Sequence, residues 1–111
     1  MVDANATPAF LIVANYVLDP ADAEAFQRIA ARMAEQAKRR PGNVFLNAAR
    51  DVADPNIFHL TEGWASQEAL DEHFRSDAFQ AVLSEALALR IVARSGSIFF
   101  ISGAQALDMP S

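Results

Sequence analysis

Cysteine is absent from this chain of 111 residues. The absence excludes disulfide bonds, thiolate catalysis and cysteine-based zinc or iron-sulfur sites. Basic residues are also scarce, with 9 lysines and arginines against 14 aspartates and glutamates, for a formal net charge of -5. Proteins that bind nucleic acid or anionic lipid need a basic surface, so this balance argues against both kinds of partner.

Long apolar runs and histidines are few as well. No apolar stretch approaches the length of a membrane span, and the N-terminal residues lack a basic region leading into a hydrophobic one, so we expect a cytoplasmic protein without membrane contact. The two histidines have no ligand-like spacing and make a poor case for a metal site. Hydrophobic residues, at 52%, are plentiful enough for the core of one domain.

Hydrophobic periodicity and capping residues predict seven elements. Strands are predicted over 9–18, 44–51, 56–64 and within 91–102, and helices over 20–38, 66–75 and 76–87. We expect Ser95-Gly96-Ser97 to interrupt the last strand. Residues 1–8 are predicted to form a loose arm, 9–102 the domain, and 103–111 a C-terminal tail.

The order of these elements, with the two last helices counted as one bent unit, is β-α-β-β-α-β. This order is typical of the ferredoxin-like α+β fold, in which helices cover one face of a four-stranded antiparallel sheet. The run Phe10 to Leu18 is apolar at nearly every position, as is Ile98 to Ile101, so the second sheet face must also be covered. We expect a second copy to cover it, which gives a homodimer with sheets face to face.

The segment from Glu62 to Phe79 holds the only tryptophan and one of the two histidines. Glu62 and Trp64 share a strand face, and His73 shares a helix face with Leu70 and Phe74, so an indole and an imidazole could meet. Trp64 is either a core anchor or a wall against a substrate. His73 is either a structural histidine or a proton acceptor suited to neutral pH.

Two further polar residues lie on predicted strands. Asn15 is an amide within an apolar strand, where an unpaired polar group costs roughly 1 to 3 kcal/mol, so it needs partners. Those partners are either neighbouring strands and the dimer axis, or a ligand. His59 has the opposite parity to Trp64, so we expect it to face away and to serve the sheet or the dimer interface.

Residues spread over most of the chain carry a family resemblance: Pro41-Gly42, Asp54-Pro55, Glu62-x-Trp64-x-Ser66, Ala69-Leu70, His73, Ser76 and Phe79. From residue 9 to about 102 the chain resembles the antibiotic biosynthesis monooxygenase family, with similarity to its quinol monooxygenases. The resemblance implies a dimeric α+β barrel. It also implies oxidation of a small phenolic or hydroquinone-type aromatic by dioxygen without metal, flavin or other cofactor.

Within that implied chemistry, a phenol must lose a proton before it can pass an electron to dioxygen. We assign His73 as the general base, Asn15 as a hydrogen-bond donor to the oxyanion and Trp64 as an aromatic wall. The residues assigned to line the pocket are Phe45, Phe74, Phe79 and Leu83. Two alternatives stay open: a non-catalytic dimer that binds a small aromatic or hydrophobic molecule, and a cofactor-free isomerase.

The family also includes haem-degrading enzymes, which the chain resembles at one position only. Those enzymes use an asparagine on the first strand, which Asn15 matches, and a tryptophan followed ten residues later by an iron-ligating histidine. Alignment of the second helix puts His73 at the tryptophan position and Leu83 at the ligand position. Leucine cannot ligate iron, so the resemblance argues against haem degradation.

Overall fold

The computed structural model describes residues 7–110. Its elements are β1 (Phe10–Leu18), the short 3-10 helix η1 (Pro20–Asp22), α1 (Ala23–Lys38), β2 (Asn43–Arg50), β3 (Ile57–Trp64), α2 (Gln67–Arg75), α3 (Asp77–Leu87) and β4 (Ile91–Phe100). Most of the predicted arm, residues 1–6, and the last residue of the predicted tail lie outside the described part, so the domain limits stay a prediction. No described helix is long and apolar enough to cross a membrane.

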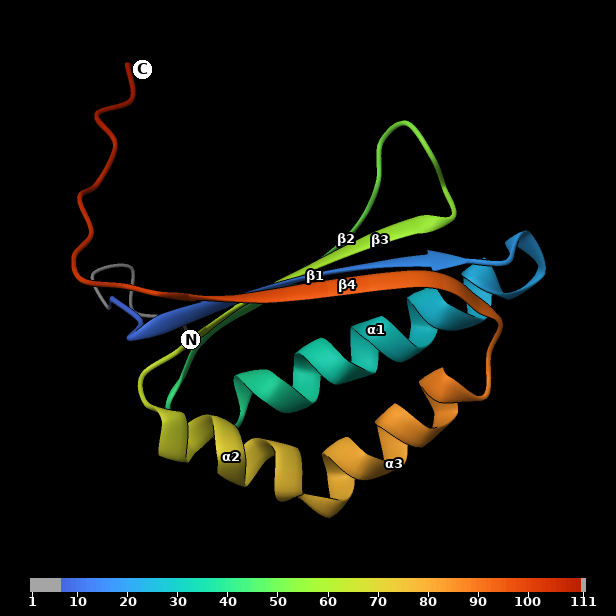
Figure 1. Ribbon diagram of the computed structural model, residues 1–111, viewed down its shortest axis with the longest axis horizontal. Helices are drawn as coiled ribbons and strands as arrows, with labels where there is room; N and C mark the ends of the chain where they lie inside the picture. Colours follow the sequence, from blue (N-terminus) through green and yellow to red (C-terminus); the bar gives the residue numbers. More distant parts are fainter. Residues whose placement is uncertain (1–6, 111) are drawn as a thin grey trace.

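The four strands form one antiparallel sheet in the order β2-β3-β1-β4, with β1 paired to β3 on one side and to β4 on the other. The three helices lie on one side of this sheet (Figure 1). The fold is therefore the predicted ferredoxin-like α+β arrangement. On the other side, the turn between β2 and β3 and the segment after β4 both rise away from the helices at opposite ends of the sheet (Figure 1).

Strand parity separates an inner sheet face, toward the helices, from an outer face. On β1 the inner residues Phe10, Ala14 and Leu18 are buried, and they belong to two hydrophobic clusters that α1 completes with residues such as Phe26 and Ala37. Ile12 and Tyr16 have the same inner parity, whereas the odd-numbered residues of β1, from 11 to 17, point to the outer face. No described helix covers that outer face.

The expected interruption of the last strand is wrong. β4 runs through Ser95, Gly96 and Ser97, which pair with β1 residues in unbroken register, and the only irregularity of this pair falls between Val17 and Leu18. Glycine and serine favour turns in an isolated segment, but the edge of β1 offers β4 a continuous ladder of backbone hydrogen bonds. Pairing therefore outweighs the local preference.

Two serines set the limits of the second helical unit, as the sequence predicts. Ser66 begins α2 and accepts a hydrogen bond from the Ala69 N–H at 3.1 Å. Ser76 has extended backbone angles, ends α2 and caps α3, where its Oγ accepts from the Phe79 N–H at 3.2 Å. The second capping serine, Ser76, thus predicts the bend between α2 and α3 from the sequence.

Gly42 places the start of α2 against the sheet, and a first prediction concerns it. Its φ of +83° is a left-handed conformation, its carbonyl accepts from the Ala65 N–H at 2.7 Å, and an added Cβ would overlap the Cβ of Ala69. We expect Gly42→Ala to lower the free energy of unfolding by about 2 to 4 kcal/mol, from backbone strain plus overpacking. Urea denaturation measures the loss. A Cβ at Gly103 meets nothing, so Gly103→Ala should change stability by less than about 0.5 kcal/mol, and equal losses in both variants would contradict the account.

Candidate active site

An aromatic cluster lies between the inner sheet face and the two short helices. The ring centroids of Trp64 and His73 are 4.9 Å apart, those of His73 and Phe79 are 4.8 Å apart, and those of Phe74 and Phe79 are 5.2 Å apart. We call these four residues the inner cluster. The predicted meeting of indole and imidazole is confirmed.

The chain reaches this arrangement through local signals. β3 ends at Trp64, and α2 begins three residues later with Leu70 and His73 facing the sheet, 1% and 2% exposed. At the end of α2, both the N–H and the hydroxyl of Ser76 donate to the His73 carbonyl, at 3.1 and 2.7 Å. The turn at Ser76 then redirects the chain so that Phe79 lies against the imidazole.

Burial controls the charge of His73. Removal from water, and to a smaller extent the charge of Arg40, lowers the pKa of His73 from 6.5 to about 4. The imidazole is therefore neutral at pH 7. Its Nδ1 is fully buried and has no hydrogen-bond partner among the described residues.

Glu62 lies beside the cluster on the same face of β3 as Trp64. Its Oε1 accepts a hydrogen bond from the Trp64 indole N–H at 3.1 Å, and the residue is only 8% exposed. Burial raises the pKa of Glu62, an effect that the Trp64 hydrogen bond partly offsets. Sequence reasoning placed Glu62 on this face but left it out of the candidate site. The sequence did contain a signal for it, because burying an unpaired carboxylate on the inner face of a strand costs free energy and such a residue is therefore a candidate functional group.

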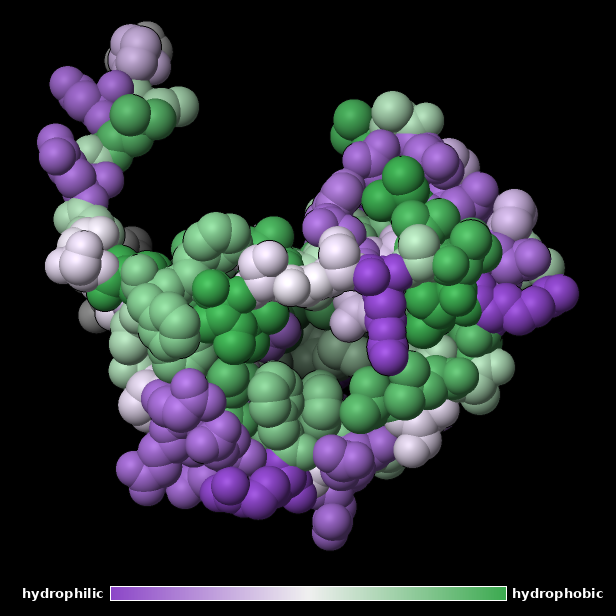
Figure 2. Space-filling model, viewed as in Figure 1, coloured by the Kyte–Doolittle hydropathy of each residue, from purple (hydrophilic) through white to green (hydrophobic). Residues whose placement is uncertain are grey.

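The inner face continues from Glu62 toward Tyr16 and Arg94, which are register partners on β1 and β4. The pKa of Tyr16 is raised overall. Burial is the main cause and the negative charge of Glu62 adds to it, while the positive charge of Arg94 offsets part of the rise. Ile98 and Phe100, on the same side of β4, are 48% and 80% exposed. Figure 2 shows a hollow between β4 and the helices α2 and α3, with apolar side chains on much of its rim. A small molecule could enter the inner face here.

The structure divides the predicted site residues between the two sheet faces. His73, Trp64, Phe74 and Phe79 form the inner cluster, and Leu83 is half-buried one turn after Phe79 on α3. Asn15 and Phe45 are not brought to this cluster, because their strand parity directs them to the outer face. There the Phe45 ring lies over Gly63.

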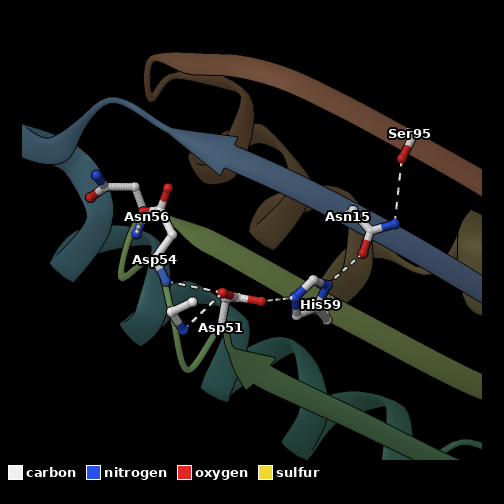
Figure 3. A network of polar contacts seen from close by, with 7 residues as sticks. Asn15, Asp51, Asp54, Asn56, His59 and Ser95 are labelled. Carbon is white, nitrogen blue, oxygen red and sulfur yellow. Dashed lines mark hydrogen bonds and ion pairs between the residues drawn. The ribbon is translucent and has the colours of Figure 1, made fainter.

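On the outer face, Asn15 belongs to a polar network that reaches from β4 across β1 and β3 to the end of β2 (Figure 3). Its Oδ1 lies 2.6 Å from His59 Nδ1, its Nδ2 donates to Ser95 Oγ at 3.4 Å, and His59 Nε2 lies 2.8 Å from Asp51 Oδ1. The hydrogen bond with His59, followed by the N–H groups of Ala53 and Asp54, lowers the pKa of Asp51. His59 therefore faces away from Trp64 as predicted, and the partners of Asn15 lie on the neighbouring strands.

Within residues 7–110 no three acidic or histidine side chains gather to hold a metal ion.

Comparison with known proteins agrees with this architecture. Residues 9–84 match the family model described as antibiotic biosynthesis monooxygenase. A Nitrosomonas europaea structure that carries the same family name has a TM-score of 0.78 at 19% identity, over 85% of this chain and 99% of that chain. SnoaB of Streptomyces nogalater, a cofactor-independent oxygenase solved as a mutant, has a TM-score of 0.74 at 19% identity, over 86% and 94% of the two chains.

A conserved protein from Methanosarcina mazei has a TM-score of 0.77 at 20% identity, over 85% of this chain and 93% of that chain. No curated protein is significantly similar to the chain in sequence. At these identities the solved structures establish the fold alone, whereas the family model spans most of the domain. The chain belongs to the antibiotic biosynthesis monooxygenase family.

Proposed function

We propose that this protein is a cofactor-independent monooxygenase that oxidises a small phenolic or hydroquinone-type aromatic with dioxygen. The observation that carries the proposal is the inner cluster, in which a buried, neutral imidazole lies between an indole and a phenyl ring. Aromatic walls of this kind suit a flat, apolar ligand that offers only a few polar atoms. Family membership and the fold shared with SnoaB support the same choice.

The proposed reaction begins with loss of the substrate's hydroxyl proton in a site that excludes water. We place His73 in contact with that hydroxyl group, and the sequence hypothesis makes it the candidate general base. Its neutral imidazole keeps a lone pair free at pH 7, but a pKa of about 4 makes it a weak acceptor. Glu62, a second titratable group of the same face, therefore competes with His73 for the proton.

Oxygen consumption with a panel of hydroquinones tests the proposal. We expect wild-type protein to exceed the rate of autoxidation, and His73→Ala to lower kcat/KM by about 100-fold or more, since a well-placed proton-transfer group contributes roughly 100- to 10,000-fold. Arg75→Ala, an exposed change in the same helix, is the matched control and should keep the wild-type rate. A rate equal to autoxidation, or an undiminished His73→Ala variant, would count against the proposal.

Two other outcomes would identify a different function. Thermal stabilisation by a phenol without turnover would indicate a binding protein. Turnover that persists without oxygen would indicate an isomerase. Both measurements use the same substrate panel, so one set of samples separates the three functions.

We also propose that the protein acts as a homodimer joined through the outer sheet faces. Leu11, Val13 and Val17 of β1 point to that face, and Phe99 of β4, 54% exposed, lies beside Leu11. An apolar strip at the centre of a sheet is typical of an interface rather than of a wet surface. A second copy placed there by two-fold symmetry would cover the strip on both chains and leave each inner cluster within its own chain.

A further inference from the structure

The position of Glu62 departs from what burial normally allows. Glu62 is only 8% exposed, and it lies on the inner face of β3 opposite Ile12 of β1 and Leu46 of β2. None of the ion pairs formed by the described residues includes it. A buried carboxylate without a cation is costly, and groups held in this way concentrate at functional sites.

The two oxygens of Glu62 have different surroundings. Oε1 accepts the indole N–H of Trp64 at 3.1 Å, which fixes the orientation of the carboxyl group. For Oε2 the described residues provide no donor, yet this atom is not among the fully buried polar atoms that lack a partner. Oε2 is therefore not sealed off, and it keeps contact with open space on the inner face.

The two nitrogens of His73 also differ. Nδ1 is fully buried without a partner, whereas Nε2 is not among the buried unpaired atoms. An unpaired lone pair is tolerated more readily than an unpaired N–H, because an orphaned donor is the rarer and costlier case in folded proteins. We therefore assign the proton of the neutral ring to Nε2, so that His73 presents an N–H donor at the cluster.

Glu62 and His73 also bind protons in an unusual order, since a histidine ordinarily has a higher pKa than a glutamate. Burial lowers the pKa of His73 to about 4 and raises the pKa of Glu62 above its ordinary 4.5. A single proton delivered to the two groups goes to the carboxylate first. A bound aromatic that displaces water would move both values further in the same directions.

We propose that Glu62 is the group that takes the substrate's hydroxyl proton, an inference that rests on the function proposed above. His73 donates a hydrogen bond from Nε2 to the phenolate oxygen that forms. In this step the substrate O–H bond breaks, its electron pair stays on the substrate oxygen, and the proton forms a new O–H bond at Glu62 Oε2. Trp64 holds the carboxylate in place through Oε1. His73 then stabilises charge instead of accepting the proton.

The test is the variant Glu62→Gln, whose side-chain carbonyl still accepts from Trp64 but takes no proton. We expect a loss of about 100- to 10,000-fold in kcat/KM for hydroquinone oxidation and disappearance of the fall in rate at acid pH. Glu68→Gln, the same change at an exposed position of α2, should leave rate and pH profile unchanged. Because Glu62→Gln removes a buried charge, it should unfold at the wild-type temperature or above, which separates lost chemistry from lost fold.

The pH profiles of the two variants decide which residue is the base. If Glu62 accepts the proton, the acid limb stays in His73→Ala and vanishes in Glu62→Gln. The reverse pattern, with His73→Ala losing the limb, would overturn the inference and leave the proposed monooxygenase intact.

A second readout needs no turnover. With 4-nitrophenol bound, nitrogen-15 NMR of His73 should show a neutral ring protonated at Nε2, and infrared difference spectra should show a protonated carboxyl group that Glu62→Gln lacks. A doubly protonated ring would overturn the inference. The expected spectra in a protein that oxidises no hydroquinone would support the proton assignment and contradict the oxygenase function, and absence of both binding and turnover would contradict both.

Discussion

Lowering the pH from 7 to 4 is expected to remove about 3 kcal/mol of stability through His73 alone, since each pKa unit corresponds to roughly 1.4 kcal/mol. In the folded protein the pKa of His73 is about 4, whereas an unfolded histidine has the ordinary value of 6.5. Above pH 6.5 both forms are neutral and the stability is fully present. Between those values only the unfolded chain binds the proton, so stability falls as the pH falls.

Urea denaturation of the wild type and of His73→Leu at several pH values isolates this contribution. Glu62 acts in the opposite direction, because its raised pKa lets the folded chain take up a proton first as the pH falls. Its effect, and those of the exposed acids, are common to both proteins and cancel in the difference. The stability advantage of the wild type over His73→Leu should shrink by about 3 kcal/mol, and parallel curves would show that His73 is not buried as a neutral ring.

An aspartate at the centre of the outer sheet face is expected to abolish the proposed homodimer. Val13 lies on β1 between Thr61 and Ser97, in the middle of the apolar strip. By symmetry Val13→Asp would place two carboxylates in the interface, and each unpaired buried charge costs several kcal/mol. We expect the dimer dissociation constant to rise by about 1,000-fold or more, equivalent to about 4 kcal/mol.

Sedimentation measurements over a range of protein concentrations give the dissociation constants. Ala81→Asp introduces the same charge at an exposed position of α3, on the helix side, and should leave the dimer unchanged. In a monomer the Val13→Asp side chain faces solvent, so circular dichroism should report a folded chain. A wild type that is already monomeric at micromolar concentration, or a dimeric Val13→Asp variant, would contradict the proposed interface.

Several features of the candidate site could be predicted because they depend on neighbouring residues. Glu62 and Trp64 share a face and His59 opposes them because strand side chains alternate. Ser66 and Ser76 begin their helices because a short hydroxyl side chain satisfies free N–H groups of the first turn. Capping and alternation act over a few residues, so they can be recognised without knowing the rest of the fold.

Other features depended on how distant strands meet. β1 is apolar on both faces, so its own residues do not indicate which side carries Asn15. The pairing of Asn15 with His59 settles the question, since a shift of one residue in register would exchange the two faces. The run Ser95-Gly96-Ser97 reads as a turn alone and forms a strand only because β1 offers it a partner.

The sequence by itself therefore determined the order of the elements, their caps, the ferredoxin-like fold and the likeness to a family, because each follows from local chemistry or from residues at set spacings. The tertiary structure alone decided that Asn15 belongs to the face opposite the inner cluster, that Ser95-Gly96-Ser97 continues a strand, and how far burial shifts the pKa of His73. These properties arise from strand register and from packing between segments far apart in the chain, and no short stretch of sequence contains that information.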